Sequence, residues 1–274
     1  MNEYLERKER TSRIIKKFPR QKIMVNYIDE LWSIDLADFS NKKYEFKYVL
    51  FVIDGWSKYL WISFLKNKTA DEILNGILDI FKQTTRRPEK IMSDQEAGLF
   101  SKKAKDFFQK NNIFLYHTNT GSDEQAASHN PFAERVIGTI KLWVSRYYFN
   151  LEMKNALVTA VEKYNNTIHS TIKMTPIDAS KNTNQKKLAK IFTDYYSEYV
   201  PKNYNILNQG DSVRIYQFKK KFEKGYEPRW SKEIFTIGAV HPTKPVTYTL
   251  FDQKGEKIIG KFYSQQLLKS SVAQ

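Results

Sequence analysis

The sequence predicts a mixed α/β domain followed by a small all-β barrel, and three observations lead to this prediction. Three apolar, strand-like runs come first, between residues 31 and 66. Strand-like runs then alternate with runs of helical periodicity up to residue 150, an order typical of a mixed sheet flanked by helices. After residue 205 the pattern changes to short strands separated by turns, which is typical of a small barrel of the SH3 type.

The composition limits the kind of protein. The chain has 274 residues, of which 41% are hydrophobic and 15% aromatic, so it is long enough to bury a sizeable core. No apolar run reaches the length needed to cross a bilayer, and the charged N-terminus is unlike a signal peptide, so we expect a soluble intracellular protein. The absence of cysteine excludes disulfides and thiolate metal sites. The four histidines are scattered, so any bound metal would have oxygen ligands.

The charge is strongly positive. The net charge of +15 and the isoelectric point near 9.6 indicate a polyanionic partner, nucleic acid first. A host with a codon bias toward lysine and asparagine is the alternative explanation. Residues 1–24 carry eight Lys and Arg against three Glu, and we expect them to form a basic N-terminal arm, helical or extended. A solvated tail is the alternative for this segment.

Residues 25–150 are expected to form the α/β domain. A tight turn at Gly55–Lys58 joins its second strand to its third, which predicts a hairpin. Apolar residues recur at helical spacing behind Thr69, a candidate N-cap, and residues 118–128 are a polar loop. The strands are expected at 31–40, 48–56, 59–66, 89–94 and 113–118, and the helices at 69–87, 102–111 and 130–149.

Two further modules are expected. Residues 151–204 continue as helices and a linker. Residues 205–274 are expected to form the barrel, with turns at Gly225, Pro242 and Gly255 between its strands. These strands are expected at 211–218, 233–240, 246–252 and 257–264.

The first expected strand places two aspartates, Asp35 and Asp38, in an apolar run. A carboxylate taken out of water is costly unless something pairs with it. Alternation places the two acids on opposite faces of the strand, so they are not a local pair. One of them reaches solvent near the strand end, whereas the other needs a cation. The two faces would be Ser33, Asp35 and Ala37 against Trp32, Ile34, Leu36 and Asp38.

Three carboxylates are candidates for one site. Asp35 lies in the middle of a strand, Asp94 ends a strand, and Glu134 lies early in the helix after the polar loop. Strand ends and helix starts are where α/β sheets gather functional groups. Converging carboxylates would suit Mg²⁺ or Mn²⁺, and two such ions could clamp the attacking and leaving oxygens of a phosphoryl transfer. By spacing alone, the competing acids are Asp38, Asp54 and Glu124.

Four motifs occur in order along the chain. They are W-x-x-D at Trp32–Asp35, V-I-D-x-x-S-K-Y at Val52–Tyr59, S-D at Ser93–Asp94 and E-R at Glu134–Arg135. Together they resemble the catalytic core of retroviral-type integrases, closest to those of large DNA transposons and virophages of the Maverick/Polinton type. The resemblance covers residues 19–182 and extends to the barrel, where "GDSVRIYQFKKKFEKGYEPRWSKEIFTI" is similar to the C-terminal domain of the same integrases. It implies an RNase H-like fold with a DDE triad.

The resemblance also implies roles for single residues. Glu134 is favoured over Glu124 because it lies on the helix. Lys141, two turns after Glu134, would contact the DNA end, and Asn130, one turn before it, would face DNA. The metal-binding catalytic triad would be Asp35, Asp94 and Glu134.

Cations and aromatic residues interleave in the expected barrel, which suits contacts to a nucleic-acid backbone. The residues are Lys219, Lys220, Lys221, Arg229 and Trp230. A solvated barrel rim is the alternative explanation. An aromatic cage for a histone tail, built from Tyr216, Trp230 and Phe235, is a further alternative, although core packing explains these residues more simply.

The sequence departs from the family pattern in three ways. The interval from Asp94 to Glu134 is longer than in retroviral integrases. Gly138 replaces a basic residue, which removes a DNA contact and weakens the helix by about 1 kcal/mol relative to alanine. Because the chain has no cysteine, it does not hold the His₂Cys₂ zinc domain that precedes the retroviral core.

The resemblance implies a DNA integrase that trims the 3′ ends of a mobile element and joins them to target DNA. It implies two Mg²⁺ or Mn²⁺ ions per active site, no nucleotide cofactor, and a dimer or tetramer on double-stranded DNA. It also implies the nucleus of a eukaryotic host or a virophage-infected cell. The alternatives are a catalytically silent, domesticated protein that binds DNA or chromatin, and an RNase H-like nuclease.

Overall fold

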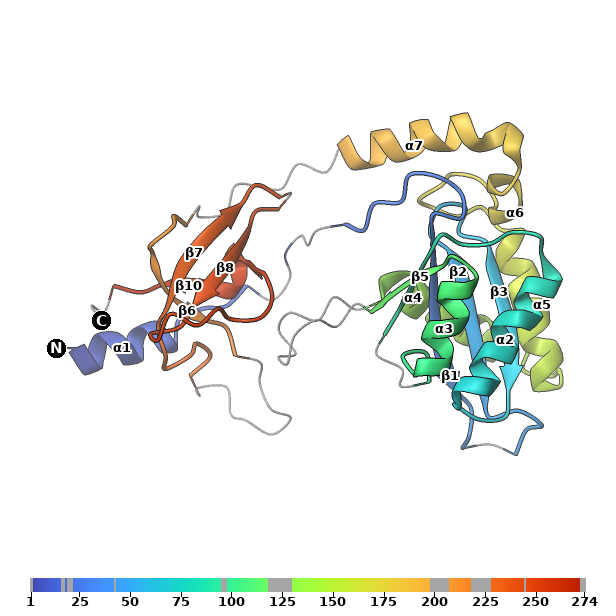
Figure 1. The fold of residues 1–274 in the computed structure, drawn as a ribbon, viewed down its shortest axis with the longest axis horizontal. Coiled ribbons are helices and arrows are strands. Elements are labelled where there is room, and N and C mark those ends of the chain that lie inside the picture. The colour runs from blue at the N-terminus through green and yellow to red at the C-terminus, as the bar shows by residue number, and fades with distance from the viewer. Residues whose placement is uncertain are drawn as a thin grey trace. The chain divides into compact units, whose positions relative to one another are not determined.

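The computed structural model describes residues 2–15, 18, 22–41, 43–94, 98–117, 130–197, 207–217, 228–243 and 245–271. The chain divides into two units (Figure 1). One comprises the described residues from 24 to 197, and the other combines the described part of 2–23 with the chain from 207 onward. None of the helices in these described ranges is long and apolar enough to span a membrane.

The first unit is built on a mixed five-stranded sheet, as predicted. Its strand order is β3-β2-β1-β4-β5. The first three strands pair antiparallel, whereas β4 and β5 run parallel to β1. The strands are β1 (Leu31–Asp38), β2 (Tyr48–Asp54), β3 (Leu60–Leu65), β4 (Lys90–Ser93) and β5 (Phe114–His117).

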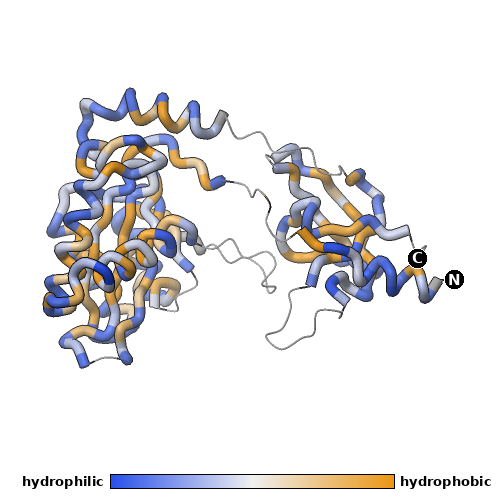
Figure 2. The backbone as a smooth tube through the Cα atoms, turned by 180° about the vertical axis from the view of Figure 1, so that it is seen from behind, coloured by the Kyte–Doolittle hydropathy of each residue, from blue (hydrophilic) through white to orange (hydrophobic). Residues whose placement is uncertain are grey.

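Helices cover both faces of this sheet. Two of them, α2 and α3, pack on the face that carries Trp32 and Ile34, while α4 and α5 pack on the face that carries Ala37 and Phe51. Hydrophobic residues therefore recur along the strands and on the inner sides of the helices (Figure 2). The helices are α2 (Ala70–Gln83), α3 (Lys102–Lys110), α4 (Pro131–Tyr147) and α5 (Met153–Asn165).

Helix starts follow the expected chemistry in α2 and α3. The hydroxyl of Thr69 accepts a hydrogen bond from the backbone N–H of Glu72, which confirms Thr69 as the N-cap of α2. The hydroxyl of Ser101 accepts one from Ala104 at the start of α3. Both helices begin within a residue or two of the sequence-based bounds because the caps define them.

The chain after α5 returns to the β2–β3 turn. The short helix α6 (Pro176–Ala179) and a 3₁₀ turn (Asn182–Asn184) lead into α7 (Gln185–Ser197). Trp56 in the turn stacks on Phe192 of α7, with ring centroids 4.5 Å apart. The indole N–H of Trp56 also donates to Oε1 of Gln185 at 2.8 Å. These contacts hold α7 on the first unit.

The second unit is an antiparallel sheet of five strands in the order β10-β6-β7-β8-β9, together with α1 (Asn2–Arg10). The end strands β9 and β10 do not pair with each other, so the closed barrel that the sequence predicted is not confirmed. The expected strand 257–264 is also shorter, because only Phe262 and Tyr263 pair with β8. The strands are β6 (Ser212–Ile215), β7 (Phe235–His241), β8 (Thr247–Phe251), β9 (Phe262–Tyr263) and β10 (Leu267–Lys269), and a 3₁₀ turn covers Ser264–Gln266.

Candidate active site

The middle of β1 carries the first candidate carboxylate. Asp35 is half-buried and lies on the same face of the sheet as Ser33 and Ala37, which is the face covered by α4. Its Oδ1 accepts a hydrogen bond from the backbone N–H of Leu36 at 2.8 Å. The alternation predicted from the sequence is therefore confirmed, and Asp35 belongs to the side where the helix bearing Glu134 packs.

The second candidate carboxylate, Asp94, directly follows the strand that pairs with β1. β1 and β4 are parallel neighbours, and Ile34 pairs with Ser93. Asp35 directly follows Ile34, and Asp94 directly follows Ser93. Asp94 is half-buried, like Asp35. Parallel pairing therefore aligns the residues that directly precede two acids lying far apart in the sequence.

The start of α4 is fixed on β1 by Asn130. The amide Nδ2 of Asn130 donates to the carbonyl of Ile34 at 2.8 Å, and its Oδ1 accepts from the hydroxyl of Ser33. The side chain is fully buried and does not cap its own helix. Glu134 follows one turn later and is exposed, with its backbone N–H donating to the carbonyl of Asn130 at 3.1 Å.

Asn130 was expected to face DNA, and the structure gives it a different position. Its exposed fraction is 0%, because both polar ends of the amide are used on the central strand. The residue thus positions the helix that carries Glu134. Sequence periodicity does not reveal this, since the partners of Asn130 lie almost a hundred residues earlier in the chain.

Lys141 lies two turns after Glu134 and is exposed on α4, as expected. Its ammonium group lies 5.2 Å from the ring centre of Phe39, just after the end of β1. The competing acid Asp38 is exposed at that strand end. Its pKa is lowered by hydrogen bonds from Ser40, with a smaller contribution from Lys141.

Asp54, another competitor for the metal site, belongs to a buried ion network. Its carboxylate is 0% exposed and pairs with Nη2 of Arg86 at 2.6 Å. It also accepts from the backbone N–H of Ser57 at 2.9 Å, while Arg86 pairs with Asp29 at 2.7 Å. Because its oxygens serve the β2–β3 turn and Arg86, Asp54 has a structural role.

Sequence reasoning did not single out Lys58, whose side chain is buried at the same turn. Its ammonium group donates to the carbonyl of Gly55 and lies 4.1 Å from the ring centre of Phe132, in the first turn of α4. Burial lowers the pKa of Lys58 to about 7, although Asp54 acts in the opposite direction. The one sequence feature that could have indicated a buried lysine was its position inside the motif at Val52–Tyr59.

The residues expected to bind DNA in the second unit are only partly described. Lys219, Lys220 and Lys221 lie outside the described residues. Arg229 is half-exposed, and its backbone carbonyl accepts from the N–H of Gln217 at 2.7 Å. Trp230 and Phe235 are buried, which fits core packing better than an aromatic cage.

The chemistry of the donor set fits a divalent cation. Asp35, Asp94 and Glu134 offer only carboxylate oxygens, the ligands that Mg²⁺ and Mn²⁺ prefer. Within the ranges that the structure describes, no three acidic or histidine side chains are close enough to hold a metal ion together. The three acids therefore do not form a closed cluster among the described residues.

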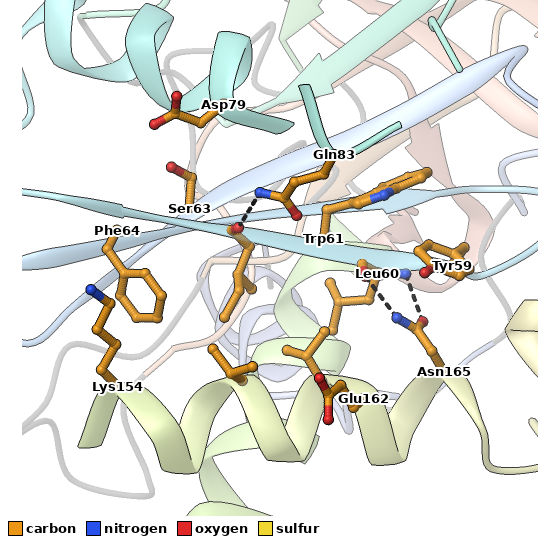
Figure 3. A pocket seen from close by; sticks show the side chains of 13 residues that line it. Tyr59, Leu60, Trp61, Ser63, Phe64, Asp79, Gln83, Lys154, Glu162 and Asn165 are labelled. Carbon is orange, nitrogen blue, oxygen red and sulfur yellow. Dashed lines mark hydrogen bonds between the residues drawn. The ribbon is translucent and has the colours of Figure 1, made fainter. Parts of the chain in front are cut away.

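A cavity of about 570 Å³ is lined by residues 59–64 and by residues of α2 and α5, and none of the three acids is among its lining residues (Figure 3). It runs along the edge strand β3, between α2 and α5. Asn165 occupies the outer edge of β3 by accepting from the N–H of Leu60 and donating to its carbonyl, both at 2.9 Å. Gln83 donates to the carbonyl of Ile62 at 3.4 Å. These amides partly cover the strand edge.

Part of the first unit is similar to a known protein family. Residues 28–123 match the integrase core domain family. The matched segment contains Asp35 and Asp94 and ends before Glu134. An uncharacterised transposon-derived protein of Caenorhabditis elegans is 25% identical over 229 residues, which cover 82% of this chain and 73% of that protein.

A solved viral structure shares the fold of this chain. A chain of the simian T-cell lymphotropic virus intasome, solved with the PP2A regulatory subunit B56 gamma, is 14% identical over 97% of this chain and 87% of that chain, with a TM-score of 0.65. The HTLV-2 integrase catalytic core, solved with magnesium, is 20% identical over 56% of this chain and 97% of its own, with a TM-score of 0.46. The intasome chain therefore shares the fold of this chain, and residues 28–123 of the first unit are similar to an integrase core domain.

Proposed function

We propose that this protein is a DDE integrase of a mobile DNA element. The observation that supports the proposal is the register of β1 and β4, in which Ile34 pairs with Ser93, the residues just before Asp35 and Asp94. Helix α4, which bears Glu134, packs on the face of the sheet that carries Ala37. The three carboxylates would hold a pair of Mg²⁺ or Mn²⁺ ions, and bound ions of this kind would supply activation of a nucleophile and stabilisation of the leaving oxygen in phosphoryl transfer. The similarity of residues 28–123 to the integrase core supports this assignment.

The proposed reaction has two steps on double-stranded DNA. Water first attacks a phosphodiester near the 3′ end of the element and releases a short fragment, leaving a free 3′-hydroxyl. That hydroxyl then attacks a target phosphodiester, so the bond that breaks in the target is replaced by the bond that joins the two DNAs. No nucleoside triphosphate is consumed, because each joining step exchanges one phosphodiester for another.

Different residues of the chain would position helix α4 and contact the DNA. Asn130 and the buried turn at Gly55–Lys58 hold the start of α4 in place, so Glu134 and the exposed Lys141 are presented on one helix. Lys141 would contact the DNA end beside the scissile phosphate. Arg229 and the triplet Lys219–Lys221 would contact the DNA backbone.

Several finer assignments belong to the same proposal. The element would be of the Maverick/Polinton kind, as the resemblance of the four sequence motifs implies. The modules would be a basic arm at 1–24, a catalytic core at 25–150, a helical extension at 151–204 and a DNA-binding module at 205–274. The protein would act as a dimer or tetramer on DNA in a eukaryotic nucleus.

A strand-transfer assay tests the proposal. Labelled element-end duplexes are incubated with a plasmid target and Mg²⁺ or Mn²⁺, using the wild type, Glu134→Gln and, as a matched control, Glu162→Gln on the exposed side of α5. We expect joined product in the wild type and the control and none in Glu134→Gln. DNA binding without joining in any variant would indicate a silent DNA-binding protein. Cleavage of an RNA–DNA hybrid without joining would indicate a nuclease.

A further inference from the structure

The N-terminal helix α1 is anchored in the C-terminal sheet by a buried charge. The carboxylate of Glu9 accepts from Nε of Arg214 at 3.0 Å, from the hydroxyl of Ser270 at 2.9 Å and from the backbone N–H of Ser271 at 2.7 Å. Arg214 is 1% exposed, and it also donates to the carbonyls of Ser231 and Lys232. A side chain buried this deeply requires its anionic partner, so α1 is an integral part of this unit.

The chain after α1 runs beside the segment that contains Arg229. The carbonyl of Arg10 accepts from the backbone N–H groups of Arg229 at 2.8 Å and Trp230 at 3.3 Å. The carbonyl of Ser12 accepts from the indole N–H of Trp230 at 3.1 Å. Backbone and side-chain contacts together therefore fix the arm next to a residue proposed to bind DNA.

The arm presents cations on its exposed side. Arg7, Lys8 and Arg13 are exposed, and Glu9 is the one acid between residues 7 and 13. Because Glu9 turns inward to Arg214 and is only 13% exposed, it contributes little negative charge to that surface. Arg10 is the remaining cation of the segment and pairs with Glu6 at 3.6 Å.

We propose that α1 and the C-terminal sheet form one composite DNA-binding surface, in which Arg7, Lys8 and Arg13 contact phosphates next to Arg229. The proposal rests on the proposed function in taking DNA as the ligand. It assigns the arm to the binding module, although the arm and the sheet lie at opposite ends of the sequence. Charge complementarity identifies the ligand, since a surface of arginine and lysine fits a regular array of phosphates.

The test measures binding of the full chain to a labelled DNA duplex by fluorescence anisotropy over a range of salt concentrations, with EDTA present. Arg7→Gln/Lys8→Gln removes two arm cations, and Lys254→Gln/Lys257→Gln removes two exposed cations from the connection after β8 as a matched control. We expect the arm variant to bind about tenfold more weakly and its salt slope to fall by about 2, because each phosphate contact releases counterions. The control should stay within about twofold of the wild type. Equal losses in the two variants, or no loss in the arm variant, would overturn the proposal.

A second variant separates arm placement from net charge. Glu9→Gln makes the chain more positive, so binding governed by net charge alone would tighten. The composite surface predicts weaker binding, because the arm loses its anchor at Arg214. Tighter binding would overturn the proposal. All of these measurements omit divalent metal, so an absence of strand transfer by the wild type would leave their outcome unaffected.

Discussion

At the scale of single residues, two aspartates at strand ends of the same sheet illustrate how differently one substitution acts. Asp54→Asn should destabilise the first unit by about 3 kcal/mol, because it removes a buried carboxylate that faces Arg86 at 2.6 Å. Asp38→Asn, on the exposed end of β1, should leave the unfolding transition close to that of the wild type. Urea unfolding followed by near-UV circular dichroism measures both. Similar transitions for the two variants would contradict the structural role of Asp54.

Lys58 makes the stability of the first unit depend on pH. Burial holds its pKa at about 7, whereas the unfolded chain has the ordinary value of 10.5. Between these values the unfolded chain binds more protons, so the free energy of unfolding should rise with pH, by up to about 1.4 kcal/mol per unit. The surrounding charged groups are Asp54 and Arg135, and His169 stays neutral because burial lowers its pKa to about 4.

The check is a comparison with Lys58→Met, which keeps the buried chain length and removes the titrating group. Urea unfolding of both proteins from pH 7 to pH 10 should show the wild type gaining stability relative to the variant. The exposed Lys66→Met serves as the control and should follow the wild type. Parallel curves for wild type and Lys58→Met would show that the ammonium group is not the origin of the pH dependence.

At the scale of secondary-structure elements, two helical glycines are predicted to respond in opposite ways to alanine. A Cβ on Gly138 of α4 would meet nothing within 4 Å, so Gly138→Ala should stabilise the protein by about 1 kcal/mol through helix propensity. A Cβ on Gly76 of α2 would lie 2.7 Å from Cδ2 of Leu65. The steric clash should cancel the stability that helix propensity adds, so Gly76→Ala should not stabilise the protein. Thermal unfolding of the two variants distinguishes them. A gain in both would mean that α2 can shift on the sheet.

The elements of the first unit could largely be predicted from the sequence, because their signals are local. Alternation placed Asp35 on the face of Ala37, and Thr69 capped α2 as expected. The buried position of Asn130 could not be predicted, because its hydrogen-bond partners lie on β1, far away in the sequence. The residues next to Asn130 do not indicate such distant contacts. The open C-terminal sheet differs from the expected barrel for a similar reason, since strand closure depends on pairing between distant segments.

At the scale of the whole molecule, the two ends of the sequence meet in one unit. The composition gave the arm its positive charge, but an ion pair between Glu9 and Arg214 spans more than two hundred residues. Glu9, whose carboxylate anchors the arm, lies within a basic run of the sequence. Its anchoring role therefore cannot be recognised from the neighbouring residues. Order along the chain therefore does not define the units of this protein.

Acid should release the arm from the C-terminal sheet. Burial alone would raise the pKa of Glu9, but hydrogen bonds from Ser271, Arg214 and Ser270 outweigh it and lower the pKa to about 2. The anchored state is therefore fully stabilised above about pH 4.5, the ordinary value, and loses stability progressively as the pH falls through about 2. Hydrogen exchange of the α1 amides between these pH values measures the loss.

The variants decide whether Glu9 is responsible for that release. Glu9→Gln should show weak protection of α1 that does not change between pH 4.5 and pH 2, because the titrating carboxylate is gone. Asp211→Asn is the matched control: Asp211 also has a lowered pKa, from hydrogen bonds with Asn208 and Lys269, and neither of these partners lies on the arm. It should keep the acid-dependent loss of the wild type. If Glu9→Gln loses protection over the same pH range as the wild type, another acid anchors the arm.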